Sequence, residues 1–111
     1  MLKIAIGLFV AAAVLGIIIL RAIIQQSETP KVAVFIHGLL AAAGLGLVTY
    51  YVITNPDNNP LVSLIILAIG AVGGFYLLAR DLKKKPGPIG LAIIHMLAGL
   101  TGVILLLMFV I

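Results

Sequence analysis

The chain has 111 residues, of which 64% are hydrophobic and only ten are charged, seven basic and three acidic. Together with a mean hydropathy of +1.37, this composition indicates an integral membrane protein rather than a soluble enzyme. The absence of cysteine excludes disulfides, thiolate metal sites and covalent c-type haem attachment.

Four apolar runs follow one another along the chain, and each is long enough to cross a hydrocarbon layer as a helix. The predicted helices cover residues 2–24, 32–54, 61–79 and 89–111. The first run is closed by Arg21, so we expect a retained span and not a signal peptide. The connections are too short to fold as domains, and neighbouring helices must therefore be antiparallel. The sequence thus predicts one all-α domain over residues 1–111, an integral membrane four-helix up-down bundle.

Prolines mark the starts of three predicted helices. Each directly precedes an apolar run, where its missing N–H costs nothing and its fixed φ suits a first turn. The residue before each proline is expected to cap the helix. These pairs are Thr29 and Pro30, Asn59 and Pro60, and Gly87 and Pro88.

Most charged residues belong to one face, which carries the first and third loops. Its basic residues are Arg21, Lys31, Arg80, Lys83, Lys84 and Lys85, and its acidic residues are Glu28 and Asp81. The other face has Lys3 and Asp57. The positive-inside tendency therefore predicts an inner (plasma) membrane protein with loops 1 and 3 cytoplasmic and both termini on the outer, periplasmic side. Because the bases are confined to loops and are not interleaved with aromatic residues, we expect no nucleic-acid binding.

The second and fourth predicted helices resemble each other when residues 30–53 are aligned with 88–111 without a gap. The matches least expected by chance between two apolar helices are Pro30 with Pro88, His37 with His95, and Gly44 with Gly102. The preceding helices match Gly16 with Gly74 and, after a one-residue gap, Arg21 with Arg80. We therefore expect two parallel two-helix repeats, about 1–56 and 60–111, related by a pseudo-two-fold axis along the membrane normal.

Two histidines lie inside these apolar helices, His37 and His95, each seven residues after its proline. At about 1.5 Å per residue, both are expected roughly 10 Å from the cytoplasmic helix ends. Their helices stand on a diagonal of the predicted bundle, so the imidazoles can face one another. Neutral imidazoles are common axial ligands of haem iron, and helix bundles build such sites in their cores. We predict that the two histidines ligate the iron of one haem b per chain.

Glycines are expected to make room for this haem. Gly16 and Gly74 lie at about the depth of the histidines, while Gly44 and Gly102 follow on the histidine faces of their helices. Missing side chains at these positions would leave a flat slot in the bundle.

Basic residues are expected to bind the haem propionates, which would be costly in hydrocarbon without cations or water. Arg21 and Arg80 lie at the cytoplasmic end, and their guanidinium groups can bind carboxylates bidentately. Lys31 is a second candidate for this contact.

With these residues in place, the chain resembles small membrane-bound b-type cytochromes, in which histidines on transmembrane helices hold haem within a four-helix core. The resemblance rests on His37, His95, nearby small residues, Arg21 and Arg80, and it includes no long motif. It implies single-electron transfer with a quinone or a redox protein, and oxidoreductase chemistry if the protein is an enzyme. Many relatives carry two haems on four histidines, so transfer across the whole membrane would need another chain here. The sequence leaves open whether chains form a homo-oligomer.

Other functions remain open at this point. The histidines could hydrogen-bond and tighten packing, or carry protons or a bare metal ion. Four spans are also similar to small proton-coupled multidrug exporters, but the intramembrane carboxylate of those transporters is absent, so His37 or His95 would have to replace it. A non-catalytic membrane subunit or assembly factor is a third class. Hydrolase or transferase chemistry has no supporting motif.

Overall fold

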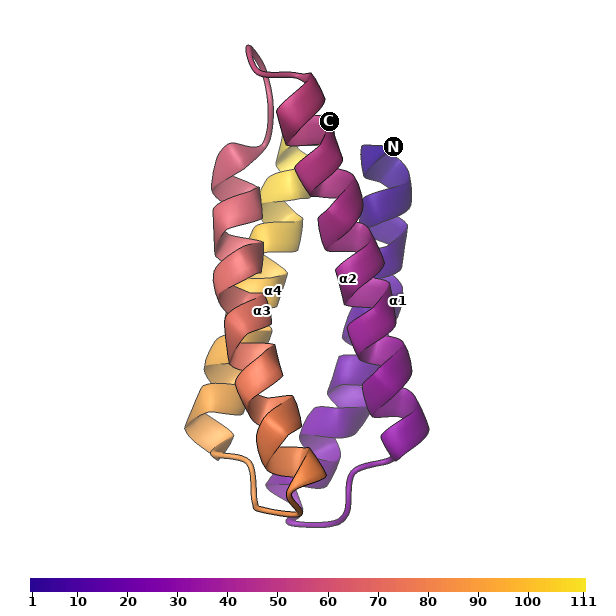
Figure 1. Ribbon diagram of the computed structural model, residues 1–111, viewed down its shortest axis with the longest axis vertical. Helices are drawn as coiled ribbons and strands as arrows, with labels where there is room; N and C mark the ends of the chain where they lie inside the picture. The colour runs from indigo at the N-terminus through magenta and orange to yellow at the C-terminus, as the bar shows by residue number, and fades with distance from the viewer.

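The computed structural model describes residues 1–111 and contains four α-helices and no strands. The helices are α1 (Leu2–Ile24), α2 (Lys31–Thr54), α3 (Leu61–Leu82) and α4 (Ile89–Val110), as labelled in Figure 1. All four are long and apolar enough to cross a membrane. The predicted all-α chain with four membrane-length helices is therefore confirmed.

The predicted bounds of α1, α2 and α4 agree with the structure to within one residue, whereas α3 continues three residues beyond Ala79, to Leu82. The prediction ended α3 where the apolar run ends. Neither Arg80 nor Asp81 breaks a helix, however, and the next proline is Pro86, so the helix continues past the apolar run. The prediction of this end was wrong because hydrophobicity marks the hydrocarbon layer and not the last helical turn.

Prolines begin three helices as predicted, since Pro30, Pro60 and Pro88 occupy the N-cap positions of α2, α3 and α4. The prediction that the preceding residues cap these helices was wrong, because none of the three helices has a side-chain capping hydrogen bond. With proline itself at the N-cap, the preceding side chain lies one position too far back to reach the free N–H groups. Thr29 is instead bonded to Asp81.

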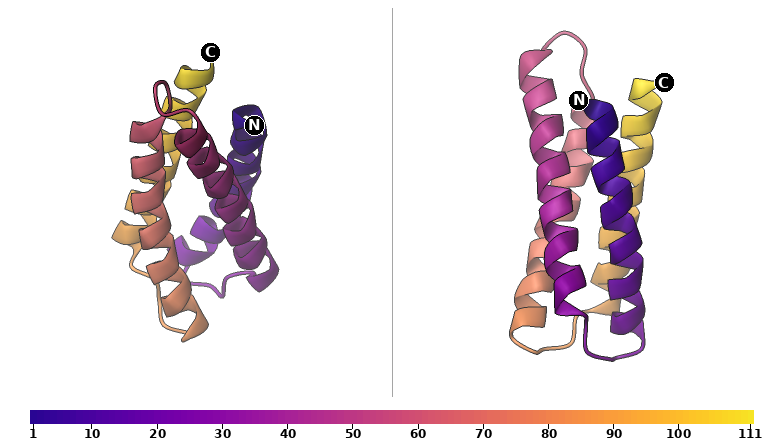
Figure 2. Two further views of the ribbon diagram at one scale, coloured as in Figure 1. Left: turned by 45° about the horizontal axis from the view of Figure 1, so that its top comes forward. Right: turned by 90° about the vertical axis from the view of Figure 1, so that its right-hand side faces the viewer.

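Helices α1 and α2 pack chiefly against each other and form the first hairpin, while α3 and α4 form the second. The backbones of α2 and α4 do not contact one another, and neither do those of α1 and α3, so each pair lies on a diagonal. Both termini lie at the same end of the molecule as the α2–α3 loop (Figures 1 and 2), and we call this the terminal end. The α1–α2 and α3–α4 loops lie at the opposite end, which we call the loop end.

Large buried side chains gather in the half of the molecule nearer the terminal end. The core cluster there consists of Leu2, Ala5, Phe9, Val48, Leu67 and Leu106. From the middle of the bundle to the loop end, the buried apolar side chains are only alanines: Ala12, Ala22 and Ala92. The two hairpins are therefore held together by large buried side chains at the terminal end and have only small buried apolar side chains near the loops.

Two glycines allow the helices of each hairpin to approach closely. A Cβ on Gly44 would lie 2.9 Å from the Phe9 ring, and a Cβ on Gly102 would lie 2.5 Å from Cγ of Leu67. Small residues commonly permit such contacts between membrane helices, where dispersion replaces the hydrophobic effect as the main source of attraction. The side chain of Ser63 adds a hydrogen bond of 2.6 Å to the Gly102 carbonyl.

Replacement of Gly102 by alanine should destabilise the bundle. The added methyl group overlaps the Leu67 side chain, and overpacking of this kind costs about 1–3 kcal/mol. Reversible unfolding by sodium dodecyl sulfate in mixed micelles would measure the change. The matched control is Gly99→Ala on the same helix, where nothing lies within 4 Å of the new Cβ and no loss of stability is expected. Equal stability of the two variants would contradict the close contact.

Candidate functional site

The structure brings His37 of α2 and His95 of α4 together across the interior of the bundle. Their ring centroids are 6.1 Å apart, and the ring planes are inclined by 77°. Both residues are half-buried. The two imidazoles therefore come from different hairpins and face each other on the diagonal of the bundle.

Each imidazole is fixed by its own hairpin through a backbone carbonyl. Nδ1 of His37 lies 2.7 Å from the Ala12 oxygen of α1, and Nδ1 of His95 lies 2.7 Å from the Gly70 oxygen of α3. A carbonyl oxygen only accepts hydrogen bonds, so Nδ1 must carry the proton in both rings. In a neutral ring Nε2 then keeps its lone pair, which is the arrangement found in most metal-ligating histidines.

Gly16 and Gly74 provide the space in which these rings lie. A Cβ on Gly16 would be 3.1 Å from Cε1 of His37, and a Cβ on Gly74 would be 2.9 Å from Cε1 of His95. Each glycine comes four residues after the carbonyl that the same imidazole binds, so the ring covers one helical turn of its partner helix. The glycines lie at the histidine level, as predicted, and each contacts the imidazole of its own hairpin.

Gly44 and Gly102 lie nearer the terminal end than the histidines, and their space is filled. The Phe9 ring covers Gly44 and the Leu67 side chain covers Gly102. The slot expected along this face is therefore closed on the terminal side. A flat ligand between the imidazoles would extend toward the loop end, where the buried apolar residues are alanines.

The three predicted carboxylate-binding residues all lie at this loop end, in different environments. Arg21 is exposed and has no hydrogen-bond partner. Arg80 donates from Nε and Nη2 to the carbonyl of Pro86, at 3.3 and 2.9 Å. The amine of Lys31 is already paired with Asp81 at 2.8 Å, so it is the least available of the three.

Sequence reasoning missed a polar cluster of Thr29, Lys31 and Asp81, which we call the clasp. Oγ1 of Thr29 donates to Oδ1 of Asp81 at 2.6 Å, while Nζ of Lys31 binds Oδ2 of Asp81 at 2.8 Å and Oγ1 of Thr29 at 2.9 Å. A usable signal existed, because the start of α2 and the end of α3 are neighbours at one face and carry opposite charges. Lys31 was instead expected to contact a haem propionate, and Asp81 entered only the charge balance that orients the chain.

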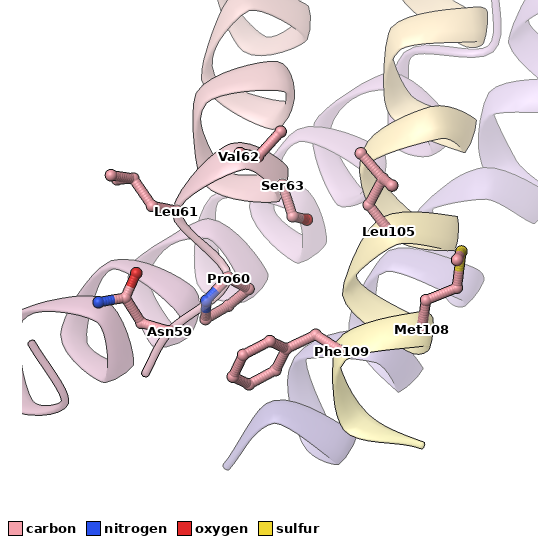
Figure 3. A pocket seen from close by; sticks show the side chains of 8 residues that line it. All are labelled: Asn59, Pro60, Leu61, Val62, Ser63, Leu105, Met108 and Phe109. Atoms are coloured by element: carbon pink, nitrogen blue, oxygen red, sulfur yellow. The ribbon is translucent and has the colours of Figure 1, made fainter. Parts of the chain in front are cut away.

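A surface pocket of about 310 Å³ lies at the terminal end, between the start of α3 and the end of α4 (Figure 3). Its lining residues are Asn59, Pro60, Leu61, Val62, Ser63, Leu105, Met108 and Phe109. The Ser63 hydroxyl and the Asn59 amide are already bonded to backbone carbonyls. The pocket therefore offers few free polar groups, and it is remote from the histidines.

Comparison of the chain with protein-family models, with curated proteins and with solved structures gives no match. No group of three or more histidine, cysteine, aspartate or glutamate side chains is placed to hold a metal ion. The histidine pair is thus the principal chemical feature from which a function can be argued.

Replacement of Gly74 by alanine should displace the His95 ring from the Gly70 carbonyl, because the new methyl group would overlap Cε1. The chain has only two histidines, so ¹⁵N-histidine NMR in detergent resolves each ring. Loss of the Nδ1-protonated signal of His95, with the His37 signal retained, is expected. Gly73→Ala is the control, since its Cβ would make only ordinary contacts at 3.9 Å. An unchanged His95 signal in the Gly74 variant would contradict the assigned packing.

Proposed function

We propose that the protein is a membrane-bound b-type cytochrome that holds one haem b between His37 and His95 and transfers single electrons. The observation that carries this proposal is the facing pair of imidazoles, each with Nδ1 bonded to a carbonyl and Nε2 left as the ligand atom. If the histidines served only to tighten the packing of the helices, their hydrogen bonds to the carbonyls would be sufficient. It would not require two rings from different hairpins to meet at one depth.

The separation of the rings supports ligation of a single iron. Imidazole nitrogens bind first-row metals at about 2 Å, so two rings on opposite sides of one metal have centroids about 6 Å apart. The observed separation is 6.1 Å. A bare metal ion would find no third protein ligand beside this pair, whereas a porphyrin supplies the remaining nitrogen ligands itself. The donor set therefore fits haem better than a free ion.

The protein groups around the pair have distinct tasks in this proposal. The carbonyls of Ala12 and Gly70 fix the tautomer and the plane of each ring and leave Nε2 free to bind iron. Arg21 and Arg80 would hold the propionates at the loop end, where both side chains are placed. The bound haem supplies the one-electron redox chemistry, and the apolar helices keep water from its iron.

We also propose that the up-down bundle consists of two parallel repeats, about 1–56 and 60–111. Contacts that recur 58 residues apart support this arrangement. The recurring pairs are Phe9–Gly44 and Leu67–Gly102, His37–Gly16 and His95–Gly74, and His37–Ala12 and His95–Gly70. Each repeat would then contribute one ligand, one underlying glycine and one carbonyl to a site on the pseudo-two-fold axis.

The loop end is proposed to face the cytoplasm, with both termini on the periplasmic side of the inner membrane. The excess of basic residues in the α1–α2 and α3–α4 loops supports this orientation. The haem would then lie in the cytoplasmic half of the bilayer, where a quinone in the membrane or a redox protein at its surface could exchange electrons with it.

Purified protein should bind one haem per chain and show the absorption spectrum of a low-spin six-coordinate b-type centre. Replacement of His37 or His95 by alanine removes one axial ligand, so either variant should lose this spectrum. Met96→Leu, next to His95 in sequence, is the matched control and should keep it. Absorption and magnetic circular dichroism after haem supplementation measure the result. A colourless wild-type protein would refute the proposal and leave the transporter and the non-catalytic subunit as the remaining classes.

The orientation can be tested with single cysteines, because the natural chain has none. Lys85→Cys lies in the α3–α4 loop, and Asn58→Cys lies in the α2–α3 loop at the opposite end; both positions are exposed. In intact cells an impermeant maleimide should label only the Asn58 variant, whereas in inverted vesicles it should label only the Lys85 variant. The reverse pattern would place the histidine level in the outer leaflet.

A further inference from the structure

The clasp is the one place where hydrogen bonds join the two hairpins. Apart from local bonds within the α2–α3 loop, every other hydrogen bond of the chain stays within one hairpin. The clasp bonds run from the start of the first hairpin's α2 to the end of the second hairpin's α3. Near the loops, where the buried apolar side chains are only alanines, the clasp therefore provides the only hydrogen bonds between the hairpins.

The three clasp side chains satisfy one another. Both carboxylate oxygens of Asp81 accept a hydrogen bond, one from Thr29 and one from Lys31. Thr29 is buried, and the side chains of Asp81 and Lys31 are 21% and 40% exposed. Charge-assisted bonds in such a partly dry position are stronger than those of a fully exposed ion pair.

The two hairpins meet along two seams, one between α2 and α3 and one between α1 and α4, and the clasp occurs on only the first. It closes the α2/α3 seam, where the contacts between neighbouring helices are fewest. On the α1/α4 seam, the positions 58 residues away from the clasp residues are Ile23, Gly87 and Ile89, which have no polar side chains. The site between the histidines is therefore nearly symmetric, but its surroundings at the loop end are not.

We propose that the clasp is a latch on the α2/α3 seam that controls passage of haem between the loop end and the histidine pair. This inference rests on the proposed function. With the latch closed, α2 and α3 are tied together at the loop end, where the buried apolar side chains are only Ala22 of α1 and Ala92 of α4. With the latch broken, only sparse packing opposes their separation, while the core cluster still holds the terminal end together.

The first test measures the distance between α2 and α3 beside the clasp, in protein without haem. Spin labels on Val32→Cys and Leu82→Cys flank the clasp on α2 and α3, and both positions are exposed. Addition of Asp81→Asn should lengthen and broaden the distance distribution measured by pulsed electron spin resonance, because the neutral amide forms no ion pair with Lys31 and has one acceptor oxygen where the carboxylate has two. Asp57→Asn, in the exposed α2–α3 loop, is the matched control and should leave the distribution unchanged.

The second test measures release of haem from the loaded full-length protein to an excess of a soluble haem scavenger. Loss of one charge-assisted contact should speed release about threefold to tenfold in the Asp81→Asn variant. Asp57→Asn should match the wild type. The exchanged pair Lys31→Asp with Asp81→Lys should restore a slow rate, which a purely local distortion at residue 81 would not allow.

The outcomes separate this inference from the proposed function. A broadened distance together with faster release supports the latch. An unchanged distance in the Asp81 variant overturns it, and so does a broadened distance with an unchanged release rate. If the wild type binds no haem at all, the proposed function fails on its own spectrum, and the claim that the latch controls haem passage falls with it.

Discussion

The two hydrogen bonds from histidine Nδ1 to a backbone carbonyl are the contacts on which the rest of the site depends. An imidazole inside an apolar bundle needs an internal partner, because no water replaces a missing bond there. The carbonyls of Ala12 and Gly70 meet this need within each hairpin. They fix the tautomer and the direction of each ring within its own hairpin. The association of the hairpins then brings the centroids of the two rings to 6.1 Å from each other.

Packing divides the bundle into two regions with different properties. Near the termini, side chains such as Phe9 and Leu67 fill the space above glycines of the partner helix and lock the helices together. Near the loops, alanines leave the hairpins in looser contact. The histidine pair lies between these regions. One end of the molecule is thus packed through large side chains, and the clasp provides a polar contact between the hairpins at the other end.

Much of the architecture could be predicted because membrane-length apolar runs and short loops leave few alternatives. The pairing of His37 with His95 was also predictable, since matching positions in parallel helices share one depth. The details of the site were less accessible. Gly16 and Gly74 were expected to border a slot, and each instead lies against the histidine of its own hairpin. Carbonyl partners could not be predicted, because every helical residue offers the same oxygen and only the rotation of neighbouring helices selects one.

By itself, the sequence determined the number of membrane-length helices, the starts of three of them at prolines, and the two histidines as ionisable residues of the interior. These properties follow from local composition and from the cost of polar groups in hydrocarbon. Only the tertiary structure decided which carbonyl each imidazole binds, which side chains fill the space above the glycines, and that Lys31 pairs with Asp81 across the hairpins. Such contacts depend on the rotation and approach of packed helices, which apolar sequences with similar residues on every face do not specify.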